Sequence, residues 1–368
     1  MKMKIQDTLE KIIDNRGKTP PVEETGHCLL EINAIASSGK YPDYFVIKKY
    51  VSDDTYNNWF RAGHPMPGDV LIPTVGTLDA IGMMDRSDCC IAQNMIAFRT
   101  NPEICDGEFL YYLLCDPTIR RRLLNLDIGG VQPSIKVPHL KNLEVEIPDM
   151  GIQKKVVGIL HNFDEKIKTN EKINRNLQEQ AQAIYKERFV TNADGNWEDG
   201  KLSDMISVKY GKDHKKLTEG KIPCYGSGGI MRYVETALYD QESVLVPRKG
   251  TLNNVMYINE PFWSVDTMFY TIMKVPNVAK FVFHFLKGKD LAAMNAGSAV
   301  PSMTTDILNA MELKVPSDEI LQQFESDVSP LYIAMKKNEQ ENDRLRMVRD
   351  TLLPKLMSGE LDVSDIDL

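Results

Sequence analysis

Residues that could bind a charged ligand are concentrated in one loop-forming stretch, LVPRKGTLNN, residues 245–254. Its polar side chains are Arg248, Lys249, Thr251, Asn253 and Asn254. Arg, Lys and Thr commonly bind phosphate oxygens, and Arg and Asn also read the edges of guanine and adenine. The stretch has one glycine with no Lys-Ser or Lys-Thr after it, so it is not a P-loop. It is therefore a candidate for contacting a nucleic acid.

Two nearby segments extend this candidate surface. KYGKDHKKLTEGK, residues 209–221, is rich in basic residues, and the lysines that suit phosphate contact are Lys209, Lys212, Lys215 and Lys216. After it, YGSGGIM places Tyr225 and Ser227 beside glycines, which let a backbone or a ligand approach closely. The net charge of −8 argues against coating of nucleic acid irrespective of sequence, but it allows a local basic patch.

The chain repeats itself at an offset of roughly 170 residues. LIPTVGTLDA, residues 71–80, has the same frame as the basic loop, and FLYYLL (109–114) corresponds to FVFHFL (281–286). GGVQPSIKVPHLKNLEVEIP (129–148) and AGSAVPSMTTDILNAMELKVP (296–316) share a Pro-Ser, a later leucine and a final proline. Two copies of one unit therefore make up nearly the whole chain.

The first copy of the loop has different chemistry from the second. Thr74 and Val75 stand where the second copy has Arg248 and Lys249. The candidate DNA-binding side chains of the first copy form a weaker set: Arg16, Lys18, Thr77, Gln93 and Asn94, with the triplet Arg120, Arg121 and Arg122.

A long heptad pattern follows each copy. Its core positions are Val156, Leu160, Phe163, Ile167, Asn170, Asn174, Leu177, Ala181 and Ile184 in the first copy, and Phe324, Val328, Leu331, Met335, Asn338, Asn342, Leu345 and Leu352 in the second. A single buried helix would show such a pattern too, but two matched copies favour a coiled coil between them. A buried Asn needs a polar partner, so we expect the two Asn residues of one helix to lie near the two of the other.

These patterns predict an α+β fold with two repeated globular domains, each followed by a long helix. The expected domains are residues 1–150 and 191–316, with helices in residues 151–190 and, including a C-terminal tail, 317–368. The six cysteines and six histidines show no ligand spacing for a metal, and no catalytic motif stands out. No apolar run is long enough for a membrane span or a secretory signal, so we expect a cytoplasmic protein.

Over its whole length the chain resembles the specificity subunit of type I restriction-modification systems. The motifs that carry the resemblance are DNRGKTPP (14–21), YGSGGIMRYV (225–234), LVPRKGTLNNVMYINEPFWSVDTMFYT (245–271), QPSIKVPHLKNLEVEIP (132–148) and NEQENDRLRMVRDTLLPKLMSGEL (338–361). The repeat with its two long helices is the most specific part.

The resemblance implies that each globular domain is a target-recognition domain for one half of a bipartite DNA sequence. It also implies that the two helices pair antiparallel and dock modification subunits, which methylate adenine with S-adenosylmethionine. Restriction subunits that use ATP and Mg would complete the complex. This chain would be a non-catalytic subunit that binds double-stranded DNA and itself holds no cofactor.

Two other functions remain open. The chain could serve a complex that only methylates DNA, which would be indicated by the absence of a neighbouring restriction-subunit gene. It could instead be a coiled-coil scaffold whose domains bind ligands other than DNA. That function predicts that no complex containing the chain shows salt-dependent DNA binding.

Overall fold

The structure, a computed structural model, describes residues 1–36, 39–127, 129, 133–294 and 302–366. Contacts within the chain divide it into two compact units. Unit 1 comprises Met1–Asn170 and Gln340–Leu368, and unit 2 comprises Glu171–Glu339. The two long helices therefore contribute a segment to each unit.

Unit 1 is built on a four-stranded antiparallel sheet and a smaller three-stranded sheet. The first has the order β2 (Leu9–Ile13), β8 (Met95–Thr100), β5 (Val70–Pro73), β6 (Gly82–Met83); the second has the order β4 (Tyr50–Val51), β3 (His27–Leu30), β7 (Cys89–Ile91). A separate pair joins β1 (Lys2–Lys4) and β9 (Glu144–Glu146). The helices are α1 (Asn33–Ala36), α2 (Asp53–Asn58), α3 (Gly107–Cys115), α4 (Pro117–Leu124) and α5 (Val137–Lys141), with 3-10 turns at Ile5–Thr8 and Tyr44–Val46.

Unit 2 repeats this topology strand for strand. Its four-stranded sheet has the order β11 (Ile206–Tyr210), β17 (Met268–Met273), β14 (Ser243–Pro247), β15 (Met256–Ile258), and its three-stranded sheet has the order β13 (Gly229–Val234), β12 (Ile222–Gly226), β16 (Trp263–Ser264). The separate pair is β10 (Glu198–Lys201) with β18 (Glu312–Val315), and the helices are α7 (Leu202–Met205), α8 (Ala279–Lys287) and α9 (Thr305–Asn309). The sequence repeat is therefore a structural repeat, although residues 130–132 and 296–301 of its Pro-Ser segments lie outside the described residues.

Local sequence explains the central elements of both units. The apolar runs of β5 and β14 are buried at every position, as expected for a strand with neighbours on both sides and both faces covered. Helix α3 begins at Asp106, whose carboxylate accepts hydrogen bonds from the backbone N–H groups of Glu108 and Phe109. Helices α3 and α8 are apolar nearly all round and lie in the cores, between their sheets and the long helices.

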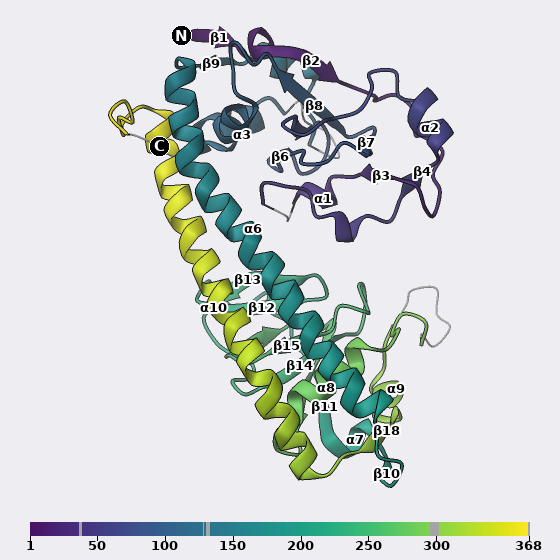
Figure 1. The fold of residues 1–368 in the computed structure, drawn as a ribbon. Coiled ribbons are helices and arrows are strands. Elements are labelled where there is room, and N and C mark those ends of the chain that lie inside the picture. The colour runs from purple at the N-terminus through teal and green to yellow at the C-terminus, as the bar shows by residue number, and fades with distance from the viewer. Residues whose placement is uncertain (37–38, 128, 130–132, 295–301, 367–368) are drawn as a thin grey trace. The chain divides into compact units, whose positions relative to one another are not determined.

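The two long helices are α6 (Met150–Lys186), which continues as a π-helical turn to Thr191, and α10 (Asp318–Met357). In Figure 1 they run side by side. Asn170 Nδ2 donates to Asn342 Oδ1 (2.9 Å) in unit 1. Asn338 Nδ2 donates to Asn174 Oδ1 (2.8 Å) in unit 2. Because the higher-numbered Asn of one helix meets the lower-numbered Asn of the other, the helices are antiparallel.

The expected α+β fold with two repeated domains and a pair of long antiparallel helices is thereby confirmed. Leu177 and Leu345, two further positions of the heptad pattern, are partly buried. Within the residues that the structure describes, every helix is too short or too polar to cross a membrane.

Candidate nucleic-acid interface

The basic loop of unit 2 follows β14 and has a fixed backbone. The Arg248 N–H donates to the Thr267 carbonyl (2.8 Å), and the Arg248 carbonyl accepts from the Met303 N–H (2.9 Å). Gly250 has a φ of +82°, a conformation that residues with a side chain rarely adopt. A Cβ there would also lie 2.6 Å from Ser227 Oγ. The chain therefore needs glycine at this point, and the loop packs against the β12–β13 turn.

The Arg248 side chain is held in one orientation by its neighbours. Its guanidinium carbon lies 4.8 Å from the centre of the Tyr210 ring, and its Nη1 donates to the Asp266 carbonyl (2.7 Å). Stacking on an aromatic ring fixes the plane of a guanidinium and leaves its outer edge able to make paired hydrogen bonds. These contacts fix the plane of the Arg248 guanidinium.

Tyr210 was not among the residues singled out from the sequence. It is 53% exposed at the end of β11, where its ring supports Arg248. An aromatic residue between Lys209 and Lys212 in a basic segment was the available signal, because aromatic rings often accompany basic residues at nucleic-acid surfaces.

Most of the other candidates in unit 2 lie at the surface. Lys209, Lys212, Lys215, Lys216, Lys249 and Thr251 are exposed, and Ser227 is partly exposed. None of these lysines forms an ion pair with another described residue. We call Lys209, Lys212, Lys215, Lys216, Arg248 and Lys249 the basic surface of unit 2.

Three candidates have structural contacts instead. Asn253 Nδ2 donates to Asp290 Oδ1 (3.0 Å) while its Oδ1 accepts from the Ala292 N–H, so both ends of the amide are used. Asn254 Nδ2 donates to the Ser227 carbonyl (2.9 Å). Tyr225 is 7% exposed and packs in the core against Phe262. These contacts hold the three side chains within the fold, and their contact with DNA stays a prediction.

The corresponding loop of unit 1 has the same backbone arrangement. The Thr74 N–H donates to the Asn94 carbonyl (2.7 Å), and the Ile135 N–H donates to the Thr74 carbonyl (2.9 Å). Gly76 has a φ of +89°, close to that of Gly250. Thr74 is buried and its hydroxyl has no hydrogen-bond partner among the described residues. At this position of the shared backbone, unit 1 therefore has a small, neutral, buried side chain, whereas unit 2 has an arginine stacked on Tyr210.

The candidates of unit 1 are also less available to a ligand. Arg16 forms a two-bond ion pair with Asp14 (2.8 and 2.7 Å), and this arginine holds the pKa of the Asp14 carboxyl below its usual range. Gln93 Nε2 donates to Thr19 Oγ1. Lys18, Thr77 and Asn94 are exposed. Among these five candidates, unit 1 therefore has one exposed cation, Lys18, whereas unit 2 has the several cations of its basic surface.

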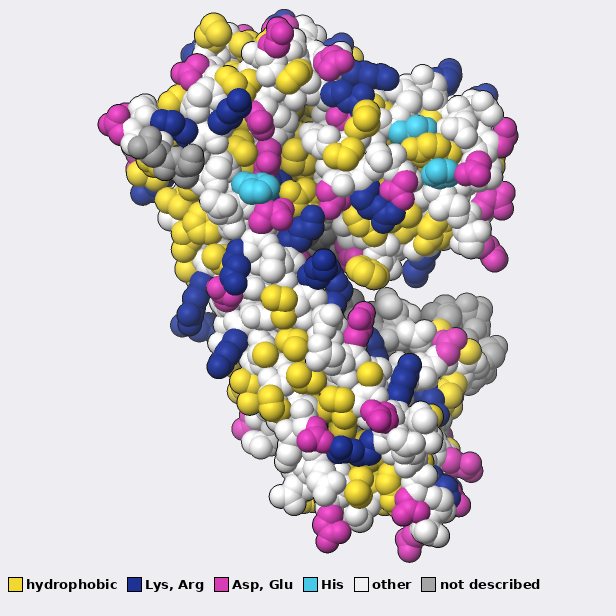
Figure 2. Space-filling view, in the orientation of Figure 1, with side chains coloured by type: hydrophobic (Ala, Val, Ile, Leu, Met, Phe, Trp, Pro, Cys, Tyr) yellow, Lys and Arg dark blue, Asp and Glu magenta, His cyan; other side chains and the backbone are white. Residues whose placement is uncertain are grey.

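The surface has no single sign of charge. On the face shown in Figure 2, basic and acidic side chains are interspersed. In the described ranges no cluster of three or more His, Cys, Asp or Glu side chains is arranged to hold a metal ion. Binding of DNA would therefore depend on local groups such as the basic surface of unit 2.

Two units of one topology, with different polar side chains on equivalent loops and antiparallel helices that pair within each unit, define a protein built from an internal repeat. The model of the type I restriction modification DNA specificity domain matches residues 67–179 and 194–345, and the chain belongs to this family. It is thus the specificity subunit of a type I restriction-modification system, a non-catalytic subunit that recognises DNA targets.

Similar proteins agree with this assignment. The MjaIX specificity subunit of Methanocaldococcus jannaschii is 24% identical, over 71% of this chain and 70% of the relative. The HindI specificity subunit of Haemophilus influenzae is 21% identical, over 75% of this chain and 82% of the relative. The crystal structure of the type I S subunit from M. genitalium superposes with a TM-score of 0.55 at 18% identity, covering 97% of this chain and 95% of that chain. The last comparison supports the fold.

Proposed function

We propose that each unit reads one half of a bipartite, asymmetric DNA sequence. The observation that carries this proposal is the identical strand order of the two units, combined with different side chains at the same loop position. One backbone arrangement places both loops alike, so the difference between Thr74 and Arg248 gives each unit its own chemistry. Two readers of different chemistry suit two different half-sites.

In unit 2, we assign phosphate contacts to the lysines of the basic surface and to Thr251 and Ser227. Arg248, fixed by Tyr210, is the side chain best placed for a guanine edge. In unit 1 the proposed contacts are made by Lys18, Thr77 and Asn94, with Arg16 and Gln93 as weaker candidates.

We assign residues 1–150 and 191–316 as the two target-recognition domains and residues 151–190 and 317–368 as the spacer helices. A protein with this internal pseudosymmetry should meet half-sites about one helical turn apart, roughly 34 Å, with unread base pairs between them. The helix pair would then set that gap, and inserting helical turns into both helices should lengthen it.

The helix pair is also the proposed docking surface for modification subunits. Ile173, Met347 and Val348 are exposed apolar side chains on α6 and α10, and such residues often mark protein interfaces. The modification subunits would use S-adenosylmethionine to methylate an adenine flipped out of the duplex, and restriction subunits would use ATP and Mg. A complex that acts on cellular DNA would work in the cytoplasm.

The first experiment is to co-express the chain with the modification subunit encoded beside it and map methylated adenines by long-read sequencing. The expected result is one split motif of two short half-sites around a fixed gap. A stable complex that leaves DNA unmethylated would contradict the proposal and favour the scaffold function. Methylation without any restriction subunit in the genome would identify a methylation-only complex.

An exchange of domains tests the assignment of the half-sites. Replacing residues 1–150 by the corresponding domain of a relative should change one half of the motif and leave the other half and the gap intact. A change in both halves would contradict the independent reading by the two units.

A further inference from the structure

A short segment of unit 1 fills the space between the edge strand β6, helix α3 and helix α6. This plug segment is residues 39–44, with the sequence GKYPDY. The Lys40 carbonyl accepts a hydrogen bond from the Met83 N–H (2.8 Å), so the segment adds to the open edge of the four-stranded sheet. Tyr41 hydroxyl donates to Glu165 Oε1 (3.2 Å), and Lys168 Nζ lies 3.8 Å from the centre of the Tyr41 ring.

Lys40 anchors the plug segment below the surface. Its ammonium contacts Glu108 on α3 and lies 3.9 Å from Asp164 on α6. Burial lowers the pKa of Lys40 to about 8, opposed by the charge of Asp164. The segment therefore supplies three things to this site: a backbone carbonyl, an aromatic ring and a buried cation.

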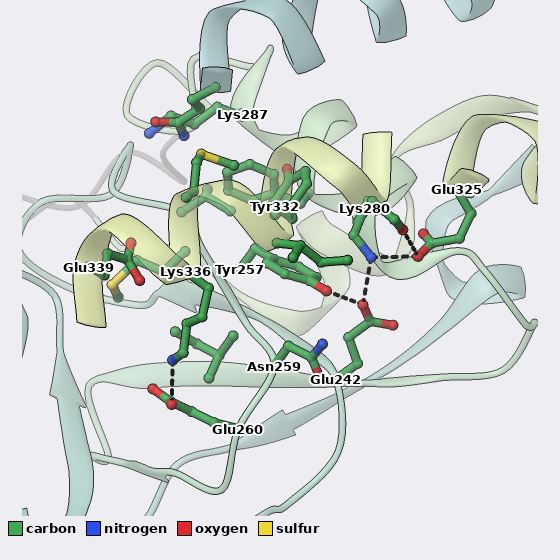
Figure 3. Close-up of a pocket in the computed structure, with 18 of the residues that line it drawn as sticks. Glu242, Tyr257, Asn259, Glu260, Lys280, Lys287, Glu325, Tyr332, Lys336 and Glu339 are labelled. Carbon is green, nitrogen blue, oxygen red and sulfur yellow. Dashed lines mark hydrogen bonds and ion pairs between the residues drawn. The ribbon is translucent and has the colours of Figure 1, made fainter. Parts of the chain in front are cut away.

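The equivalent space in unit 2 is an open groove of about 900 Å³. Because the two units share one topology, each plug-contacting residue has a counterpart. Met83 corresponds to Tyr257, Glu108 to Lys280, Asp164 to Tyr332, Glu165 to Ile333 and Lys168 to Lys336. All five counterparts line the groove, and Figure 3 shows four of them around it.

Strand β15, at the edge of the groove, has backbone groups that form no hydrogen bond with a neighbouring strand among the described residues. Both the N–H and the carbonyl of Val244 on β14 bond to the Thr271 hydroxyl, on the side away from β15. Val244 is paired with Tyr257, so the backbone groups of Tyr257 point outward, as those of Met83 do in unit 1. No described backbone group is bonded to the Tyr257 N–H. The groove therefore ends in a sheet edge that can accept one more strand.

The floor of the groove carries one negative charge in excess. Lys280 Nζ lies between Glu242 (3.1 Å) and Glu325 (2.6 Å), and Tyr257 hydroxyl donates to Glu242 (Figure 3). Glu325 Oε2 is buried without a hydrogen-bond partner among the described residues. Its Oε1 already accepts from Lys280 and from the Ser329 hydroxyl (2.7 Å), so Oε2 is the oxygen left to accept from a donor in the groove.

The entrance to the groove also matches unit 1, with one difference. Lys336 pairs with Glu260 (2.5 Å), as Lys168 pairs with Asp85 (2.9 Å) in unit 1. Ile333 is 57% exposed at the position of Glu165, which accepts the Tyr41 hydroxyl. An aromatic ring in the groove would lie beneath Lys336 and cover Ile333.

We propose that this groove binds an extended segment of another protein, which pairs with β15 as an added strand. The segment carries a lysine or arginine beside an aromatic residue: the cation meets Glu325 and Glu242, and the ring packs between Lys336 and Ile333. We identify the partner as another subunit of the restriction-modification complex, and this identification rests on the proposed function. The binding chemistry of the groove does not.

The plug segment supplies the probe. A fluorescent peptide with the sequence of residues 39–46 is titrated with the full-length protein, and binding is followed by anisotropy. We expect saturable binding that Glu325→Gln weakens about tenfold, since a charge-assisted contact is lost. A peptide with Lys40→Gln should be weakened similarly. Glu319→Gln is the matched control, because Glu319 is exposed on the same helix and does not line the groove.

A second variant tests the position of the ring. Ile333→Glu restores the acceptor that unit 1 provides for the Tyr41 hydroxyl, so it should tighten binding of the tyrosine peptide about tenfold and leave a Tyr41→Phe peptide unchanged or weakened. A surface substitution that improves binding cannot be explained by misfolding.

Two results would overturn the proposal. One is that the peptide of residues 39–46 shows no saturable binding to the protein; the other is that Glu325→Gln and Glu319→Gln change its affinity equally. The assay contains neither DNA nor other subunits. Its failure would therefore leave the methylation experiment and the reading of two half-sites unaffected.

Discussion

Units 1 and 2 have the same sheets and differ at the loops that follow β5 and β14 and at the contacts with the long helices. Both loops have the same backbone hydrogen bonds and a glycine at positive φ. Yet the loop of unit 1 has the buried Thr74 where the loop of unit 2 has Arg248, which stacks on Tyr210. A repeated scaffold can therefore keep its backbone and acquire a different surface by changing a few polar residues.

The junction between each globular part and the long helices shows the same contrast. In unit 1, Asp164 on α6 accepts from Tyr112 (2.6 Å) and Arg349 (2.6 Å), in a network of buried charges. In unit 2 the equivalent pair is neutral, Tyr332 with His284 (2.9 Å between the hydroxyl and Nε2). Equivalent positions thus hold an ionic site in one unit and an aromatic site in the other.

The largest effect is expected at Asp164. Asp164→Ala leaves Arg349 and Lys40 without a carboxylate that both approach, and removing one partner of a buried ionic network costs about 3–5 kcal/mol. Tyr332→Phe, the matched change in unit 2, removes one neutral hydrogen bond and should cost about 1 kcal/mol. Hydrogen exchange by mass spectrometry reports each unit separately. If Asp164→Ala in unit 1 and Tyr332→Phe in unit 2 reduced protection from exchange equally, the ionic network would add no stability beyond that of a neutral hydrogen bond.

Acid should destabilise unit 2 through His284. This ring is fully buried, and burial lowers its pKa from 6.5 to about 4. Its ring nitrogens face Gln182 and Tyr332, neither of which is charged. Between these pH values the unfolded state binds more protons than the folded state, so stability falls as the pH drops from about 7 to about 4, by roughly 3 kcal/mol.

The corresponding position of unit 1 is Tyr112, which does not titrate in this range. We therefore expect a His284→Gln variant to show a smaller acid-induced loss of protection in unit 2, with no change in unit 1. Thermal unfolding and hydrogen exchange at pH 7, 5.5 and 4.5 would measure this difference. An unchanged pH dependence in the variant would assign acid sensitivity to other groups.

Arg248 should contribute more to DNA binding than its counterpart. In the assembled complex, Arg248→Ala should weaken binding to the methylated target by about 1–3 kcal/mol and relax one half of the motif. Tyr210→Leu should have part of this effect, since the arginine loses its support, whereas Tyr210→Phe should retain the stack. Thr74→Ala serves as the matched change in unit 1. Affinity measured at several salt concentrations separates lost phosphate contacts from lost base reading, and unchanged affinity of the Arg248 variant would contradict the assignment.

The smallest effect is expected at the Asn pairs of the helices. Asn170 and Asn342 are almost completely buried, whereas Asn174 and Asn338 are partly exposed. Asn170→Leu leaves the Asn342 carbonyl oxygen without its donor and should cost about 1 kcal/mol. Asn174→Leu should cost less, because water can replace the lost partner. Denaturant unfolding would measure the free energy of unfolding of both variants. A larger loss for Asn174→Leu than for Asn170→Leu would contradict this prediction.

Several features could be read from the order of residues. The repeat, the α+β class and the heptad pattern depend on apolar periodicity and recurrent turns, which local sequence records directly. The registration of the helices was foreseeable as well, because a buried Asn restricts which partner can lie opposite it. The basic loop was recognisable from its composition.

The roles of single side chains depended on neighbours far away in the chain. Asn253, Asn254 and Tyr225 were predicted from the sequence as DNA contacts, and the fold adds contacts with Asp290, the Ser227 carbonyl and Phe262 that spacing did not indicate. Tyr210 became important only because β11 pairs with β17, the strand that follows Asp266, and β17 pairs with β14, the strand that leads into the loop at Arg248. Such contacts follow from strand order and packing, to which sequence spacing gives no access.

The groove illustrates the same limit. Nothing in GKYPDY indicates that it closes a sheet edge, since its partners Met83, Glu108 and Asp164 are 43, 68 and 124 positions from Lys40 in the numbering. Periodicity thus indicates a two-fold repeat with paired helices. The sequence already lacks a plug in unit 2, where residues 227–228 join β12 to β13 in place of residues 31–49 between β3 and β4. Only the tertiary structure decides where the plug binds, because the free energy of burying Lys40 depends on carboxylates that folding brings to it.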